Sequence, residues 1–191
     1  MAGGLIVVSG PSGSGKTTIA RTLLRDMPSF RFSVSATTRP MRTGEREGVD
    51  YHYLSRDEFQ RRVAAGEFVE WEEVYGNLYG TLRVEVDGAL ARGQNLLFDV
   101  DVKGALSIKE RYPGALLIFI RPPSRATLEA RLRARSTEDE STVLRRLART
   151  DMELELGSRF DRQVVNDVLD RTIAETKAIV EQYLQLNERR V

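Results

Sequence analysis

The chain has 191 residues, of which 41% are hydrophobic and 30% are charged, and this is ordinary for one globular domain with a core of its own. Its formal net charge of +1 gives no reason to expect a nucleic acid or a membrane surface as a partner. The absence of cysteine excludes disulfides and thiolate metal sites, and no stretch is apolar for long enough to span a membrane.

The first predicted elements are a strand, a loop and a helix. Residues 5–8 are a short run of Leu, Ile and Val, which predicts a fully buried strand that ends near Ser9. Apolar residues then recur at helical spacing from Ile19 until Pro28 would stop the helix. This order of strand, glycine-rich turn and helix is the one that a phosphate-binding P-loop requires.

The turn between them carries the predicted ATP site. It reads Gly10-Pro11-Ser12-Gly13-Ser14-Gly15-Lys16-Thr17, which matches the pattern G-x-x-x-x-G-K-[ST], and Thr18 follows it. Inward-pointing N–H groups would hold the β-phosphate, Lys16 would bridge the β- and γ-phosphates, and the Thr17 hydroxyl would bind Mg²⁺. A glycine-rich turn with a coincidental lysine is the alternative, and the flanking strand and helix argue against it. The loop predicts a phosphate donor and leaves the acceptor open.

Residues 32–82 interrupt this pattern with short alternating segments. Between two of them, Ser55-Arg56-Asp57-Glu58 is a capping box, which predicts a short helix ending near Gly66. We expect a small mixed α/β insertion here, with strands of its own. The single histidine of the chain, His52, stands between two tyrosines, and we interpret it as structural.

Later apolar runs at residues 96–98, 115–120 and 163–165 predict further buried strands, and a helix is expected over about 169–186. Strands that alternate with helices indicate a parallel sheet covered on both faces, so the expected class is the three-layer α/β fold of P-loop NTPases. Asp99 and Asp101 follow the strand at 96–98, at the edge where ligands of such sheets collect. Asp99 is the expected partner of Mg²⁺, directly or through water, and for Asp101 a role as helix cap is an equal alternative.

Residues 124–156 are polar and have a helical pattern. They contain Arg125, Arg131, Arg133, Arg135, Arg145, Arg146 and Arg149, and a second capping box at residues 137–140. A pair of helices with a solvated charged face is one interpretation. An arginine-rich lid over phosphates is the other.

Further motifs follow one another along nearly the whole chain. After the P-loop come Ser35-Ala36-Thr37-Thr38-Arg39 with Arg42 and Gly44-Glu45, then Glu70-Trp71, Tyr79-Gly80-Thr81, Asp99-Val100-Asp101, Pro122-Pro123-Ser124, Arg131 with Arg135, and Val165-Asn166-Asp167. In this order they resemble the guanylate kinase family, whose members transfer a phosphoryl group from ATP to GMP. Several independent motifs in order are far more specific than the loop alone.

The resemblance implies a GMP site formed by Ser35, Arg39, Arg42, Glu45, Tyr51, Glu70, Tyr79, Thr81 and Asp99. The phosphate dianion of GMP suits guanidinium and phenol donors, which implies binding by Arg39, Arg42, Tyr51 and Tyr79. Glu70 would accept the N1–H and 2-amino donors of guanine, which adenine lacks, with Ser35 and Thr81 on the O6 side. The alternative for Glu70, taken singly, is an exposed position on an alternating strand.

The resemblance also implies a lid. Arg131, Arg135 and Arg146 match the lid arginines of the family, and together with Lys16 and Arg39 they form the expected catalytic set. Phosphoryl transfer needs positioning and charge cancellation, and the anionic acceptor needs no general base.

Three further positions are read from the same resemblance. Asn166 resembles a residue close to the adenine of ATP. Lys103 stands where the family usually has Gln, which leaves its contact open, and Ser136 stands where Gly is frequent, so the flexibility of the lid is expected to differ slightly.

We therefore expect an ATP:GMP phosphotransferase in three parts: a P-loop core over residues 1–34, 83–123 and 157–191, a GMP-binding insertion over 35–82, and a lid over 124–156. Its partners would be ATP, GMP and Mg²⁺, with no nucleic acid and no membrane, and a homodimer stays open. Residues 1–9 lack a basic leader and a long apolar core, so we expect no signal peptide and a cytoplasmic location. Two alternatives remain: a non-catalytic interaction module of the same fold, and a kinase for another phosphorylated acceptor such as a sugar bisphosphate.

Overall fold

Five parallel strands form the central sheet of the computed structural model, which describes residues 3–74, 76–135 and 140–188, without the side chains of 135, 140–146 and 188. The strands are β1 (Leu5–Ser9), β2 (Phe30–Phe32), β7 (Asn95–Asp99), β8 (Leu116–Arg121) and β9 (Arg162–Val165), in the order β2-β7-β1-β8-β9. This confirms the predicted parallel sheet and four of its strands. The sequence does not predict β2, because three residues with two exposed side chains carry hardly any strand pattern.

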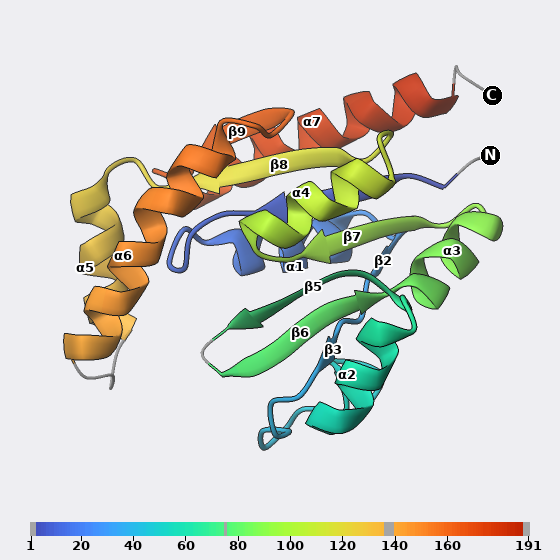
Figure 1. The fold of residues 1–191 in the computed structure, drawn as a ribbon. Helices are drawn as coiled ribbons and strands as arrows, with labels where there is room; N and C mark the ends of the chain where they lie inside the picture. The colour runs from blue at the N-terminus through green and yellow to red at the C-terminus, as the bar shows by residue number, and fades with distance from the viewer. Residues whose placement is uncertain (1–2, 75, 136–139, 189–191) are drawn as a thin grey trace.

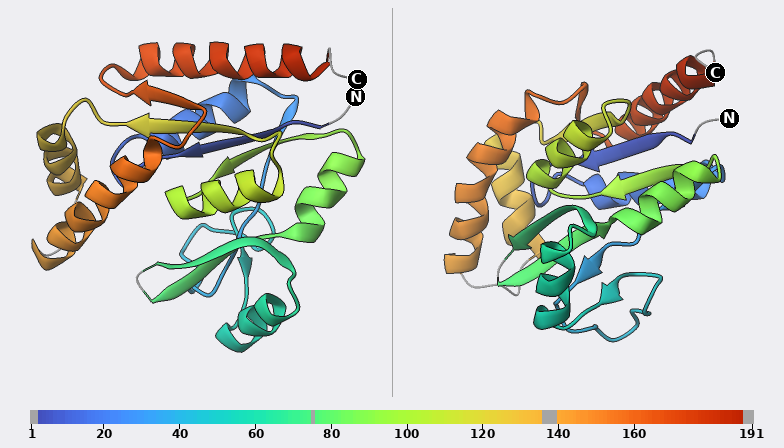
Figure 2. Two further views of the ribbon diagram at one scale, coloured as in Figure 1. Left: turned by 45° about the horizontal axis from the view of Figure 1, so that its top comes forward. Right: turned by 45° about the vertical axis from the view of Figure 1, so that its right-hand side comes forward.

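Helices cover both faces of this sheet (Figure 1, Figure 2). On one face lie α1 (Lys16–Asp26) and α7 (Leu169–Glu188), and on the other α3 (Arg83–Ala91) and α4 (Val102–Arg111). Side chains of β1 alternate between the two cores, since Leu5 and Val7 pack with α3 and α4 whereas Ile6 and Val8 pack with α1 and α7. The predicted three-layer α/β class is confirmed.

A second, smaller sheet lies below the first in Figure 1. Its strands are β4 (His52–Tyr53), β3 (Ala36–Thr37), β6 (Asn77–Leu82) and β5 (Phe68–Val74), in that order, with β3 parallel to β4 and antiparallel to β6. Against it packs α2 (Arg56–Ala64), whose Phe59 ring stacks on Phe68 with centroids 4.3 Å apart. Ser55 is confirmed as the N-cap of α2, because its hydroxyl accepts a hydrogen bond from the Glu58 N–H at 3.1 Å, whereas the Glu58 carboxylate bonds Arg62 at 2.7 Å.

The arginine-rich segment forms α5 (Arg125–Arg135) and α6 (Glu140–Gly157), which lie together at one end of the sheet (Figure 1, Figure 2). They share a small core of Leu128, Leu132 and Leu147. The helical prediction for this segment is confirmed. The second predicted capping box, at residues 137–140, lies outside what the structure describes.

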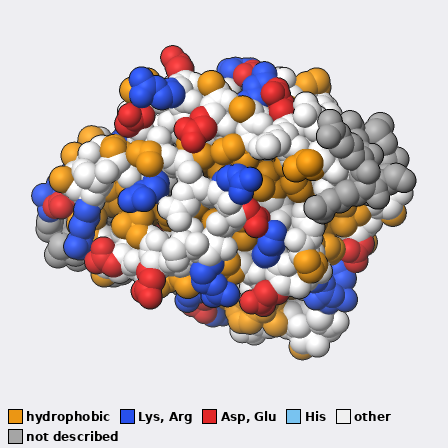
Figure 3. All heavy atoms as spheres, turned by 90° about the horizontal axis from the view of Figure 1, so that it is seen from above, with side chains coloured by type: hydrophobic (Ala, Val, Ile, Leu, Met, Phe, Trp, Pro, Cys, Tyr) orange, Lys and Arg blue, Asp and Glu red, His pale blue; other side chains and the backbone are white. Residues whose placement is uncertain are grey.

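The surface is mixed in charge. The face seen in Figure 3 carries basic, acidic and hydrophobic side chains side by side, as the net charge of +1 leads one to expect. Among the described residues, no helix combines the length and the apolar character that a membrane crossing needs.

Candidate functional site

The phosphate loop has a backbone shape that favours glycine at three positions. Gly10, Gly13 and Gly15 have positive φ angles of 150°, 86° and 92°. A Cβ on Gly10 would come within 2.2 Å of the Ile120 carbonyl oxygen, and one on Gly15 within 2.3 Å of the Asn166 amide nitrogen. No side chain caps α1 at Gly15, and uncapped N–H groups at the start of a helix suit an anion.

Thr17 and Asp99 meet at the carboxyl edge of the core sheet. β1 and β7 are adjacent and parallel with Val8 opposite Asp99, so the end of β7 lies beside the loop that follows β1. The Thr17 hydroxyl donates a hydrogen bond to Asp99 Oδ2 at 2.6 Å. These two hard oxygen ligands fit Mg²⁺, which takes few protein ligands alongside water and substrate phosphates. The described residues contain no group of three or more His, Cys, Asp or Glu side chains that could hold a metal ion. A metal at Thr17 and Asp99 would therefore need water and substrate phosphates as further ligands.

Asn166 is buried behind the phosphate loop, with 5% of it exposed. Its amide Nδ2 donates to the Ser14 carbonyl at 2.7 Å, and its Oδ1 accepts a hydrogen bond from the Thr172 hydroxyl at 3.2 Å. Its backbone carbonyl accepts a hydrogen bond from Arg131 of α5 at 3.0 Å. Asn166 therefore supports the loop and connects it to α5, and the adenine contact implied by resemblance stays a prediction.

A cleft extends from the phosphate loop to the second sheet. The part at the loop has a volume of about 300 Å³ and the part at the second sheet about 620 Å³. They adjoin, because Thr17, Tyr51 and Asp99 line both. Of the residues predicted to bind GMP, those that line the larger part are Ser35, Arg39, Arg42, Glu45, Tyr51, Glu70, Tyr79 and Asp99. The remaining one, Thr81, is fully buried and bonded to Glu70, so the fold brings the whole predicted set together.

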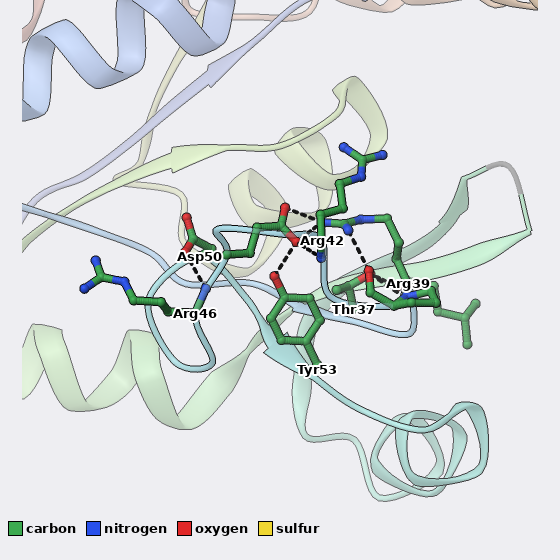
Figure 4. A network of polar contacts seen from close by, with 9 residues as sticks. Thr37, Arg39, Arg42, Arg46, Asp50 and Tyr53 are labelled. Atoms are coloured by element: carbon green, nitrogen blue, oxygen red, sulfur yellow. Dashed lines mark hydrogen bonds and ion pairs between the residues drawn. The ribbon is translucent and has the colours of Figure 1, made fainter.

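Glu45 holds Arg39 in place within a network of polar contacts that includes Arg42 and Tyr53 (Figure 4). Arg39 Nη2 donates to both carboxylate oxygens of Glu45, at 2.7 and 3.0 Å, and Glu45 also accepts hydrogen bonds from the Arg42 N–H and the Tyr53 hydroxyl. The Arg39 guanidinium, followed by these other donors, lowers the pKa of Glu45 to about 2. Desolvation and the bond to Glu45 raise the pKa of Tyr53 to about 12. Glu45 thus orients Arg39, and Tyr53 in turn supports Glu45. The sequence does not single out Tyr53 for this role.

Hydrogen-bond donors gather next to Arg39. Its guanidinium lies 5.3 Å from the centroid of the Tyr51 ring, and the Tyr51 and Tyr79 rings meet edge to face at 6.1 Å. Burial raises the pKa of Tyr51, which keeps its phenol a donor at neutral pH. A guanidinium with two phenols is a set that suits a phosphate dianion.

Glu70 is a buried carboxyl group on β5, with 8% of the residue exposed. Thr81 of the neighbouring β6 donates its hydroxyl hydrogen to Glu70 Oε1 at 2.7 Å. Gly104 leaves room for the other oxygen, since a Cβ there would lie 2.7 Å from Oε2. Burial, with a smaller contribution from the nearby Asp101 carboxylate, raises the pKa of Glu70 to about 7. The alternative that Glu70 is exposed is wrong, because β5 packs against α4.

Asp101 both caps a helix and lines the cleft. Its Oδ1 accepts a hydrogen bond from the Gly104 N–H at 2.8 Å, which confirms it as the N-cap of α4. It also lines both parts of the cleft. The helix-cap interpretation is therefore right and does not exclude contact with a ligand.

The predicted lid is described only in part. The Arg131 side chain bonds the Asn166 carbonyl, whereas the side chains of Arg135 and Arg146, and Ser136 altogether, lie outside the described residues. Arg149, which the sequence analysis names among the arginines of this segment without a role of its own, lines the part of the cleft that contains Lys16.

Comparison with known proteins gives consistent results. The family model described as guanylate kinase matches residues 3–183. The guanylate kinase of Symbiobacterium thermophilum is 51% identical over 92% of this chain and 83% of that protein, and that of Chlorobaculum tepidum is 49% identical over 95% and 94%. The crystal structure of guanylate kinase from Anaplasma phagocytophilum superposes with a TM-score of 0.76 at 32% identity, covering 95% of this chain and 86% of that one.

Proposed function

The chain belongs to the guanylate kinase family and is an ATP:GMP phosphotransferase, and we propose that its cleft holds ATP at the phosphate loop, GMP against the second sheet and Mg²⁺ between them. The observation that carries this assignment is the continuity of the cleft. Lys16 lines one part, Arg39 and Glu70 line the other, and Thr17 and Asp99 line both. Such a cleft brings two nucleotides to one point, as direct phosphoryl transfer requires.

We assign ATP to residues 10–18. N–H groups of the loop and of the start of α1 bind the β-phosphate, and Lys16 lies between the β- and γ-phosphates. Thr17 and Asp99 would hold Mg²⁺, Asp99 either directly or through water, and the bound ion would neutralise charge on the phosphate oxygens. Asn166 keeps the loop in shape from behind, and its contact with adenine is part of the proposal.

The acceptor end is assigned to the second sheet. The phosphate of GMP binds Arg39, Arg42, Tyr51 and Tyr79, with Glu45 orienting Arg39. The Glu70 carboxylate accepts the N1–H and the 2-amino group of guanine, with Ser35 and Thr81 on the O6 side. A buried polar group left without its partners costs about 1–3 kcal/mol, and more if it is charged, so adenine, which lacks these donors, is rejected.

The chemistry follows from this placement. An oxygen of the GMP phosphate bonds to the γ-phosphorus while the bond to ADP breaks, and because this oxygen is already anionic no side chain has to remove a proton. Lys16, Arg39, Arg131, Arg135 and Arg146 offset the charge on the transferred group. The lid arginines also exclude water, which would otherwise hydrolyse ATP.

The proposal extends to the organisation of the chain. Residues 1–34, 83–123 and 157–191 act as the core, 35–82 as the GMP-binding insertion and 124–156 as the lid. A cytoplasmic location is proposed from the substrates, and analytical ultracentrifugation would decide whether the chain is a homodimer.

A panel of nucleoside monophosphates tests the assignment, with ADP formation as the readout. We expect turnover of GMP, with kcat/KM for AMP, CMP and UMP lower by about a thousandfold or more. Comparable turnover of AMP would overturn the guanine assignment. Absence of binding of ATP and Mg²⁺ in a calorimetric titration would favour a non-catalytic module, and turnover of a sugar bisphosphate without GMP turnover would favour the third alternative.

A further inference from the structure

Arg149 connects three elements at the wall of the cleft. Its Nη2 donates to both carboxylate oxygens of Glu72 on β5, at 3.1 and 2.9 Å. Its Nε donates to Glu153, one turn further along α6, at 2.9 Å. The same guanidinium lies 3.6 Å from Oδ2 of Asp101, the N-cap of α4. One side chain thus joins α6, β5 and the start of α4.

The Arg149–Glu72 pair is sheltered from solvent. The exposed fractions of the two side chains are 22% and 16%. By contrast, Glu73, the next residue of β5, pairs with Arg56 at 3.1 Å, and both of those side chains are about half exposed, at 48% and 49%. Exposed pairs are screened and contribute little, whereas a sheltered pair with two hydrogen bonds constrains the elements that it joins. The two pairs therefore provide a test and a matched control on one strand.

The Arg149–Glu72 pair is attached to the part of β5 that carries Glu70. Glu72 lies two residues after Glu70 in a regularly paired part of β5, so the two side chains point to the same face of the strand. A bond that fixes Glu72 fixes the backbone that carries Glu70. Lys103 of α4 lies 3.8 Å from Glu72 and adds a second cation to the same carboxylate.

We propose that Arg149 is a positioning residue for the acceptor: by bonding Glu72, it holds β5 and the Glu70 carboxylate at a fixed place relative to the phosphate loop. This inference rests on the proposed function and refines it. It makes α6, the helix that also contains Arg146, part of the support of the GMP site. Removal of the bond weakens GMP binding and leaves ATP binding intact.

Steady-state kinetics of the full chain at pH 8, with GMP and ATP varied separately, test the proposal. Burial and a hydrogen bond to Asp101 raise the pKa of Glu72, while Arg149 opposes this, so a pH above neutral favours the ionised carboxylate. Lys103 is a further charged group beside Glu72, and Glu153 is the second partner of Arg149.

We expect Arg149→Gln and Glu72→Gln each to raise KM for GMP by about tenfold, with KM for ATP changed less than about twofold. KM for GMP in the double variant should be no higher than in the more affected single variant, since both substitutions remove the same Arg149–Glu72 bond. Arg149→Lys should restore part of the GMP affinity. Arg56→Gln and Glu73→Gln, which make the same changes in the exposed pair, should leave both KM values unchanged.

Three results would overturn the proposal: an equal rise in KM for ATP, which would place Arg149 on the donor phosphates; additive effects in the double variant; or an unchanged KM for GMP in both single variants. Should Arg149→Gln fail to fold because Glu153 loses its partner, Glu72→Gln alone decides, since it leaves the Arg149–Glu153 bond in place. Failure of the proposed function is distinguishable, because the unaltered chain would then not turn over GMP.

Discussion

At the scale of single residues, Glu70 decides which base the acceptor site takes. Its carboxylate is buried and accepts one hydrogen bond from Thr81, so a ligand that brings further donors gains their full strength. Exchange of Glu70 for Gln keeps the shape but presents a donor to the guanine donors. We expect Glu70→Gln to lower kcat/KM for GMP by about a hundredfold, with KM for ATP changed less than about twofold.

Initial rates with each substrate varied in turn measure this effect, with Glu73→Gln as the control on the exposed face of the same strand. A Glu70→Gln protein that uses GMP as well as the unaltered chain would show that the carboxylate does not read the base.

Residues differ in how far the sequence predicts them. Lys16 and Thr17 are predictable from eight consecutive letters, because a phosphate loop is a local structure. Arg39 and Glu70 are recognisable only from an ordered set of motifs, since each taken singly reads as a surface charge. Arg149 is not predictable, because its bond to Glu72 joins residues 77 positions apart and depends on how α6 meets β5.

At the scale of elements, the start of α4 shapes the base pocket. Gly104 lies in the first turn of α4, where a Cβ would stand 2.7 Å from Glu70 Oε2. The atom it meets is the end of a flexible side chain, so Gly104→Ala should displace Glu70 at little cost in stability. We expect Gly104→Ala to raise KM for GMP by about tenfold without a change in KM for ATP.

Gly114 offers the control, because a Cβ added there meets no atom within 4 Å. Kinetics of Gly104→Ala and Gly114→Ala side by side measure the effect. Equal KM values for GMP in the two variants would mean that the close approach of α4 to Glu70 does not matter for binding.

The long elements follow from sequence better than the short ones. The buried strands β1, β7 and β8 appear as apolar runs because both faces are covered by helices. β3 and β4 are two residues each, and they exist because β6 offers β3 a partner and β3 in turn pairs with β4. Such strands are set by tertiary pairing, which no local pattern encodes.

At the scale of the whole molecule, the buried carboxyl group makes stability depend on pH. The pKa of Glu70 rises from 4.5 to about 7 on folding, so between these values the folded chain binds more protons than the unfolded chain. The free energy of unfolding therefore falls as pH rises through this window. Glu70→Gln removes the titration and should gain stability relative to the unaltered chain between pH 5 and pH 8, by at most about 3 kcal/mol.

Urea denaturation of both proteins at pH 5 and pH 8, in the absence of nucleotides, measures this difference. Glu45 affects stability in the opposite direction, because folding lowers its pKa to about 2. The stability that Glu45 contributes is lost only as pH falls below 4.5, which lies outside this window. A stability difference that is the same at both pH values would mean that Glu70 is ionised throughout.

The central claim is that one cleft holds two nucleotides, with GMP read by Glu70 and held by Arg39. A crystal structure of the chain with GMP tests both contacts at once. We predict the guanine N1 and 2-amino nitrogens about 3 Å from the Glu70 carboxylate and the phosphate within hydrogen-bond distance of Arg39, Arg42, Tyr51 and Tyr79. A guanine base bound away from Glu70, with its phosphate elsewhere in the cleft, would contradict the account.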